Sequence, residues 1–356
     1  MMAYRKILIK ILLTAFLIGS TSLARAQHES DEGGKFSPGT FILDHIGDAY
    51  EWHILTYKGH HVSIPLPVIL YSKQSGLHIF MSAQFHHGSH HGFSIAVEDP
   101  HKGKIVEQAA DGSWVRPALD LSITKNVFAL FVSIAFILWI FLSVAKTYKR
   151  RENQAPKGLQ SLVEPVILFV RDDIARPAIG HTYRRYMPYL LTIFFFILVN
   201  NLMGLIPFFP FGANVTGNIA ITLVLAVFTF LITSFSANKN YWVHIINPPG
   251  VPWWLKSPIL PLLPLIELLG VFIKPFVLMI RLFANITAGH IIAIGFFSLI
   301  FIFGEMSAAL GFGASVISVL FTIFMTFLEL LVAFIQAYVF TLLSALYFGM
   351  AVEKHH

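Results

Sequence analysis

The pattern of apolar and polar positions divides the chain into two parts. Between residues 27 and 120, short stretches such as 61–70 and 77–81 alternate apolar with polar residues, as the strands of a half-buried sheet do. From about residue 121 onward the apolar residues form long runs instead. A helix needs about 20 such residues to cross a bilayer. The pattern therefore predicts a small extramembrane domain with some strand, followed by an all-α polytopic membrane domain over residues 121–356.

About five membrane-crossing helices are expected. The first covers residues 127–145, and the charge-free stretch 186–238 has room for two more around a turn at 204–218. Two long helices are expected in the last hundred residues. A helix over residues 316–350 would be about 52 Å long, against a hydrocarbon core of about 30 Å, and so has to be strongly tilted.

Two local features refine this picture. Gly311 and Gly313 predict a break before the last helix. Residues 158–180 are amphipathic and carry five charged side chains, Glu164, Arg171, Asp172, Asp173 and Arg176. That stretch is too charged to cross a bilayer and predicts an interfacial helix on the cytoplasmic surface.

Composition supports a membrane protein. Hydrophobic residues make up 56% of the chain and charged residues only 12%, which a water-soluble domain of this length does not need. The absence of cysteine excludes disulfides and thiolate metal sites. The net charge of +6 comes from basic residues that cluster beside the predicted spans, so it indicates orientation in a membrane and not nucleic-acid binding.

The N-terminus has the pattern of a secretory signal. Arg5 and Lys6 precede an apolar core, and Ala24-Arg25-Ala26 forms an A-x-A cleavage site, which predicts a signal peptide over residues 1–26. The alternative is a retained first span. The basic run that begins at Lys146 places the end of the first later span in the cytoplasm. Both signals put the domain at 27–120 in the periplasm and the C-terminus in the cytoplasm of a bacterial inner membrane.

That domain is rich in histidine. It holds 11 of the 16 histidines, and His86, His87, His90 and His91 form one loop-like cluster. Imidazoles at this spacing are possible ligands for zinc or copper. Because no carboxylate or cysteine completes a ligand set, a solvated polar loop is the preferred interpretation, and proton buffering at the membrane surface is a third. No cofactor is expected.

A few polar residues stand alone in the last apolar runs. Arg281 is surrounded by apolar residues, although a guanidinium at membrane depth costs at least about 2.5 to 3.5 kcal/mol and cannot discharge. His290 follows nine positions later and therefore points to the opposite side of the same helix. Glu329 and Gln336 are seven positions apart and share a face of the last helix. Each residue also has a purely structural interpretation. Arg281 could extend its charge to the membrane interface, His290 could be packed in the core, and Gln336 could form a hydrogen bond between helices.

These residues resemble a known family. The run from Arg281 through Asn285 to His290, the upstream Glu267, and the pair in the last helix are similar to the a subunit of the F-type rotary ATP synthase. The resemblance covers residues 121–356. Many bacterial members carry an acid where this chain has His290 and a histidine where it has Glu329, and the swap keeps one acid and one imidazole.

The resemblance implies a function and the role of each residue. The protein is then a proton-translocating stator subunit, without catalysis of its own, that meets a ring of c subunits, the b subunit of the peripheral stalk and the rest of the synthase. Arg281 is implied as the essential stator arginine, with Asn285 and Gln336 as polar neighbours. His290 and Glu329 are implied in the proton entry path, and Glu267 in the exit path.

The same sequence pattern is compatible with other functions. A sodium-coupled version of the same subunit has the same pattern, because the ring carries the ion ligands. A secondary cation transporter also places charges at mid-membrane, although the chain shows no internal repeat. An assembly scaffold does not need an intramembrane arginine.

Overall fold

A computed structural model describes residues 46–57, 60–97, 100–109, 112–151, 154–206, 209–246 and 262–353, together with Pro38, Gly39 and Ile42. The predicted signal peptide at 1–26 lies outside these described residues. The chain divides into two compact units. The N-terminal unit comprises Met1–Phe128 with Phe208–Pro210, and the helical unit comprises Ala129–Pro207 with Phe211–His356.

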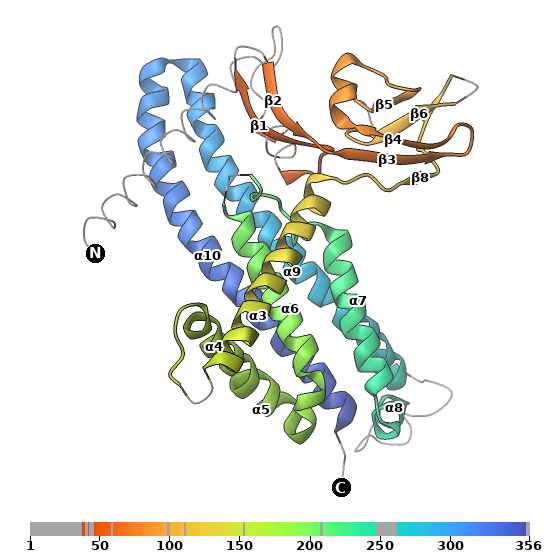
Figure 1. Ribbon diagram of the computed structural model, residues 1–356, viewed down its shortest axis with the longest axis vertical. Coiled ribbons are helices and arrows are strands. Elements are labelled where there is room, and N and C mark those ends of the chain that lie inside the picture. The colour runs from red at the N-terminus through yellow and green to blue at the C-terminus, as the bar shows by residue number, and fades with distance from the viewer. Residues whose placement is uncertain are drawn as a thin grey trace. The chain divides into compact units, whose positions relative to one another are not determined.

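The N-terminal unit is built of short antiparallel strands, as the alternating pattern predicts (Figure 1). The strands are β1 (Glu51–Tyr57), β2 (His60–Pro65), β3 (Pro67–Ser72), β4 (Gly76–Met81), β5 (Phe93–Ile95), β6 (Ile105–Gln108), β7 (Trp114–Val115) and β8 (Leu119–Asp120). They form one two-stranded sheet, β1–β2, and two three-stranded sheets with the orders β4–β3–β8 and β5–β6–β7. A small core of Val68, Leu70, Phe93 and Ile105 lies between the two larger sheets' strands.

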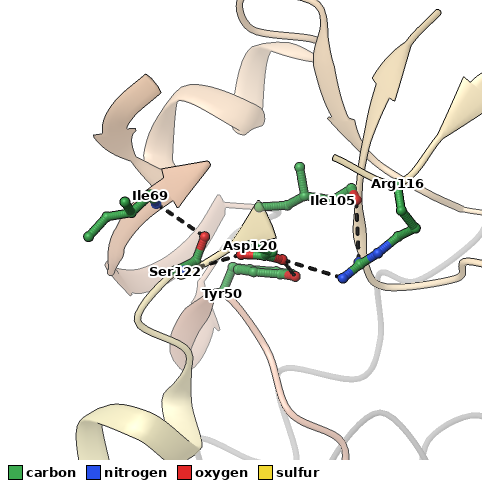
Figure 2. A network of polar contacts seen from close by, with 6 residues as sticks. All are labelled: Tyr50, Ile69, Ile105, Arg116, Asp120 and Ser122. Carbon is green, nitrogen blue, oxygen red and sulfur yellow. Dashed lines mark hydrogen bonds and ion pairs between the residues drawn. The ribbon is translucent and has the colours of Figure 1, made fainter. Parts of the chain in front are cut away.

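Asp120 at the end of β8 holds a polar network at the edge of this core. Its carboxylate accepts hydrogen bonds from the Tyr50 hydroxyl at 2.6 Å and from the Ser122 backbone N–H at 3.1 Å (Figure 2). Arg116 lies 3.7 Å from the same carboxylate and donates to the carbonyl of Ile105. Burial, and then the hydrogen bond to Asp120, raise the pKa of Tyr50 to about 12. The network therefore joins β6, β8 and the segment before β1.

The helical unit contains the five segments long and apolar enough to cross a membrane, which confirms the predicted number for the described part of the chain. Its helices are α3 (Lys125–Arg150, whose first turn belongs to the N-terminal unit), α4 (Leu159–Phe169), α5 (Arg176–Ile179), α6 (Tyr183–Gly204), α7 (Ile219–Ser236), α8 (Lys239–Ile246), α9 (Leu262–Met306) and α10 (Ala308–Val352). The predicted span at 127–145 is the middle of α3, which extends by a few residues at both ends. The pair predicted in 186–238 is α6 and α7.

The segment predicted as one interfacial helix is more broken than its pattern indicates. A π-helical turn, Val170–Ala175, separates α4 from α5, and the chain then passes almost directly into α6. The amphipathic character is confirmed, because Val163, Val170 and Ile174 are buried while Asp173 and Arg176 are exposed. Asp172 bridges Arg171 and Arg176 on the polar side.

The last two helices form a long antiparallel pair that runs side by side (Figure 1). Each has 45 residues and is therefore about 68 Å long, roughly twice the thickness of a hydrocarbon core. Both are longer than the sequence pattern alone indicates. On α10, Ala333, Gln336 and Phe340 are buried.

The predicted break at Gly311 and Gly313 is wrong. Both glycines lie inside α10, and the chain reverses one turn earlier, at Ser307, whose side chain caps the helix by accepting a hydrogen bond from the backbone N–H of Leu310. Gly311 has a packing role instead, because a Cβ there would lie 2.8 Å from the Cα of Gly304. The glycine lets the two helices approach closely just after the turn.

Candidate functional site

Arg281 lies on an exposed face of α9. A neighbouring face of the helix is fixed by Leu278 and Leu282, each 1% exposed, which pack into the core of the helical unit. Arg281 and Asn285, one turn later, are both exposed. A permanent charge is thus held at the surface of a helix that is mostly apolar. His290 is turned toward α10, as the helical spacing predicts.

A cavity of about 370 Å³ lies between α9, α10 and the end of α6. It brings together four of the predicted residues, because Asn285 and His290 of α9 and Glu329 and Gln336 of α10 all line it. A volume of this size has room for several waters. These four residues, which are up to 51 positions apart in the sequence, therefore line one cavity.

His290 and Glu329 face each other in this cavity. The Nδ1 atom of His290 lies 3.8 Å from Oε1 of Glu329. That oxygen is buried, and within the described residues it has no hydrogen-bond partner. A buried carboxyl oxygen ordinarily has a partner, and the cavity beside Glu329 has room for water.

Gly289 makes this approach possible. A Cβ on Gly289 would lie 2.8 Å from Oε1 and 3.3 Å from Cγ of Glu329, which is closer than side chains tolerate. Only glycine at this position leaves room for the carboxylate against α9. The sequence pattern did not single out Gly289, although a glycine next to a lone polar residue in an apolar helix is a signal of close approach.

Asn201 of α6 is a further residue that the sequence analysis missed. Its amide nitrogen donates to the carbonyl of Ala333 at 3.3 Å, and its amide oxygen accepts from the hydroxyl of Thr216 at 2.6 Å. It also lines the cavity that holds Glu329. An asparagine within a charge-free span was the available signal, but only the tertiary structure shows that it ties α6 to α10.

A second cavity, of about 270 Å³, lies toward the other end of α9. Glu267 and Lys274 line it together with Tyr241 of α8 and Glu353 at the end of α10. The Lys274 ammonium lies 5.7 Å from the centre of the Tyr347 ring, a cation–π contact. Burial, and then the negative charge of Glu267, raise the pKa of Tyr241.

Arg281 separates the two cavities along α9. The second cavity touches this helix no later than Lys274, seven residues before the arginine, and the first begins at Asn285, four residues after it. At 1.5 Å per residue these separations are about 10 Å and 6 Å along the helix axis. The chain thus presents two cavities, each with some polar lining residues, and a fixed positive charge between them along α9.

The histidine cluster of the N-terminal unit, which the sequence pattern places in a loop, is partly helical. His86 and His87 end a 3-10 helix, Ser82–His87, and their side chains lie outside what the structure describes. His90 and His91 have ring centroids 4.2 Å apart, and His90 bridges to Phe93. Burial, and then the neighbouring His91, lower the pKa of His90. Among the described residues no group of three or more histidines and acids has a metal-binding arrangement.

Comparison with known proteins identifies the helical part. Residues 127–349 match the family described as ATP synthase A chain. The chain belongs to the ATP synthase A chain family. Residues 41–126, which hold the β-strands, match a separate family described as a domain of unknown function.

Curated relatives agree with this family. ATP synthase subunit a of Chloroherpeton thalassium is 45% identical over 244 residues, which cover 66% of this chain and 69% of the relative. ATP synthase subunit a 2 of Chlorobaculum tepidum is 47% identical over 238 residues, which cover 65% and 64%. ATP synthase subunit a of an Anaeromyxobacter species is 34% identical over 345 residues, which cover 93% and 75%.

Family membership gives the function in outline. The chain is a multi-pass membrane protein of the ATP synthase membrane sector and acts as a proton-translocating stator subunit. The resemblance found in the sequence is thereby confirmed, and nothing favours a secondary transporter or a sodium-coupled form.

Proposed function

We propose that the two cavities beside Arg281 are two offset proton half-channels that open on opposite sides of the membrane. The observation that carries the proposal is their order along α9: one cavity with Glu267, then Arg281, then the cavity with His290 and Glu329. Neither cavity includes the arginine. A proton that enters one cavity has to bypass this charge to reach the other.

In this proposal, a rotating ring of c subunits carries protons past the arginine from one cavity to the other. Each ring carboxylate is neutral where it faces lipid, because a charge at that depth is costly. Near the exposed guanidinium of Arg281 the ionised form is favoured, so the carboxylate releases its proton there. It takes up a new proton from the other cavity before it returns to lipid. Movement of the ring then couples proton flow to ATP synthesis.

His290 and Glu329 form the entry path in this account. They are 3.8 Å apart and line one cavity, so a proton can pass between imidazole, carboxylate and water without a large movement. Asn285 and Gln336 line the same cavity at the end nearest Arg281 and act as its polar neighbours toward the ring. Glu267 lines the exit cavity.

The orientation follows from chain polarity and charge. The basic end of α3 lies in the cytoplasm, so the N-terminal unit is periplasmic, the His290 cavity opens to the periplasm and the Glu267 cavity opens to the cytoplasm. The chain itself is not a catalyst. Its partners in this proposal are the c-ring, the b subunit of the peripheral stalk and the rest of the synthase in a bacterial inner membrane.

The test replaces the buried carboxylate by its neutral isostere. Glu329→Gln is expected to lower proton-driven ATP synthesis in vesicles by about 10²-fold, the usual contribution of one positioned proton-transfer group, while ATP hydrolysis by the catalytic sector stays intact. Glu305→Gln, at the end of α9 and outside the lining of both cavities, is the matched control. Normal synthesis in Glu329→Gln, in His290→Ala and in the double variant contradicts the proposed entry path.

A further inference from the structure

The sheet β4–β3–β8 in the N-terminal unit carries apolar side chains on both faces. One face carries Val68 and Leu70, which are completely buried in the core. On the other face six apolar side chains are between 42% and 67% exposed, namely Tyr71, Leu77, Ile79, Met81, Leu119 and Leu121. An antiparallel sheet that meets water on one face ordinarily places polar residues there. This exposed apolar sheet face therefore needs an explanation.

The strand register makes the face continuous. Tyr71 lies opposite Leu77 on one side and Leu119 on the other, which forms a row of three apolar residues across all three strands. Ile69 lies opposite Ile79 and begins the next row. Adjacent strands are about 4.8 Å apart and successive rows about 7 Å, so the rows merge into one flat surface.

The face continues to the start of the first membrane span. Leu121 completes the second row, because its N–H donates to the carbonyl of Ile69 at 2.9 Å. A third row joins Met81, Pro67 and Ile123, since Pro67 pairs with Met81 and accepts a hydrogen bond from the N–H of Ile123. Ile123 lies two residues before Lys125, where α3 begins.

We propose that this apolar sheet face rests on the lipid surface of the membrane beside the start of α3. Five residues lie between Leu119 and Lys125, so even an extended chain keeps the whole strand within about 20 Å of the start of α3. The same strand is continuous with a helix whose Phe131, Leu138 and Leu142 are exposed and apolar, as in a span that meets lipid. The strand that ends the face thus leads directly into a helix with the apolar surface of a membrane span.

The chemistry of the face also fits lipid. The three rows contain aliphatic side chains, a methionine, a proline and one tyrosine, and no charged residue. Tyrosine is typical of the membrane–water interface, where its ring is buried and its hydroxyl stays hydrated. Lys73 is exposed in the turn directly after β3 and is placed to meet anionic headgroups at the rim. A second copy of the chain, or another protein, is the competing occupant.

The absence of cysteine makes a direct test simple. Ile79→Cys, and Val97→Cys as the matched control, are each labelled with the environment-sensitive fluorophore NBD in the assembled synthase, with the cysteines of the other subunits replaced. Val97 is apolar and 82% exposed in the same unit but lies after β5, off the sheet face. The complex is reconstituted in liposomes with and without phospholipid that carries a nitroxide near its headgroup.

The expected result is that nitroxide lipid removes most of the fluorescence at position 79 and little at position 97, while aqueous iodide quenches mainly position 97. Equal iodide quenching at both positions overturns the proposal, because the face is then in water. Protection of position 79 from iodide without quenching by the nitroxide lipid also overturns it, because protein then covers the face.

A second variant tests the face without a probe at its centre. With the label at Leu77→Cys, the change Ile79→Asp is expected to abolish quenching by nitroxide lipid, whereas Val97→Asp leaves it unchanged. Persistent quenching in the Ile79→Asp background contradicts the proposal. The inference depends on α3 crossing the membrane and not on proton translocation, so its failure is separable from that of the proposed function.

Discussion

Gly289 and Glu329 show how much of the site depends on single atoms. The carboxylate occupies the space that a Cβ at position 289 would fill, and this places it beside His290 on the wall of the cavity. A sequence pattern identifies Glu329, because a lone acid in an apolar run is costly and therefore informative. It does not identify Gly289, because the reason for the glycine lies on the facing helix.

Gly289→Ala is expected to lower proton-driven ATP synthesis, because the added methyl group displaces the Glu329 carboxylate from its contact with α9. Gly295→Ala is the matched control, since a Cβ at position 295 would meet nothing within 4 Å. Synthesis is measured in vesicles alongside ATP hydrolysis. Equal synthesis rates in the two variants would show that the close approach has no role in proton transfer.

Tyr50 gives a prediction for the N-terminal unit. Its pKa is raised above the unfolded value of about 10, so the stabilisation from the neutral phenol is fully present below pH 10 and is lost as the pH rises to about 12. Tyr50→Phe removes the donor to Asp120 and is expected to cost about 1 to 3 kcal/mol at pH 8. The difference from the wild type should vanish toward pH 12.

Pulse proteolysis of the unit in the assembled synthase measures this at pH 8 and at rising pH. Tyr71→Phe, at a tyrosine that is 50% exposed, is the control and should leave the cleavage unchanged. Equal resistance of Tyr50→Phe and the wild type at pH 8 contradicts the stabilising role of the hydrogen bond.

At the scale of elements, the number and class of the helices could be predicted, and their ends could not. Apolar runs give the spans because lipid demands about 20 apolar residues, whatever the tertiary structure. The residues at which a helix begins and ends depend on capping hydrogen bonds and on tertiary contacts. Ser307 caps α10 while Gly311 and Gly313 stay helical, and the π-helical turn at Val170–Ala175 leaves no mark in the apolar pattern.

The two glycines of α10 test this reasoning as a pair. Gly311→Ala is expected to destabilise the turn between α9 and α10 by about 1 to 3 kcal/mol, the usual cost of overpacking, because the new methyl group meets the backbone of Gly304. Gly313→Ala meets nothing within 4 Å and is expected to be neutral or slightly stabilising. Thermal unfolding of the purified synthase reports both. A larger loss in Gly313→Ala than in Gly311→Ala contradicts the packing role.

At the scale of the whole molecule, the lone polar residues indicated the candidate site residues, but they did not indicate how the helices are arranged around them. Arg281, His290, Glu329 and Gln336 stand out because each is costly in an apolar helix. Asn201 and the wall of the second cavity come from α6, α8 and the end of α10, and only the folded chain brings them to the same helix. Two cavities on either side of an arginine are a property of the assembly of helices, not of any one of them.

The orientation of this assembly is testable because the chain has no cysteine. Lys102→Cys in the N-terminal unit is expected to react with a membrane-impermeant maleimide added to spheroplasts. Glu353→Cys, after α10, is expected to react only once the membrane is permeabilised. The reverse pattern would contradict the periplasmic position of the N-terminal unit and the direction of both proposed half-channels.

Arg281 offers the most direct test of the account. In Arg281→Ala the charge between the cavities is lost, so ATP synthesis is expected to stop while protons leak through the membrane sector. Arg281→Lys should retain little synthesis, because an ammonium neutralises more readily than a guanidinium when it is desolvated. The measurement is the decay of a pH gradient in vesicles stripped of the catalytic sector, together with synthesis in intact vesicles. A leak without synthesis in Arg281→Ala is the predicted result, and coupled synthesis at the wild-type rate would contradict the account.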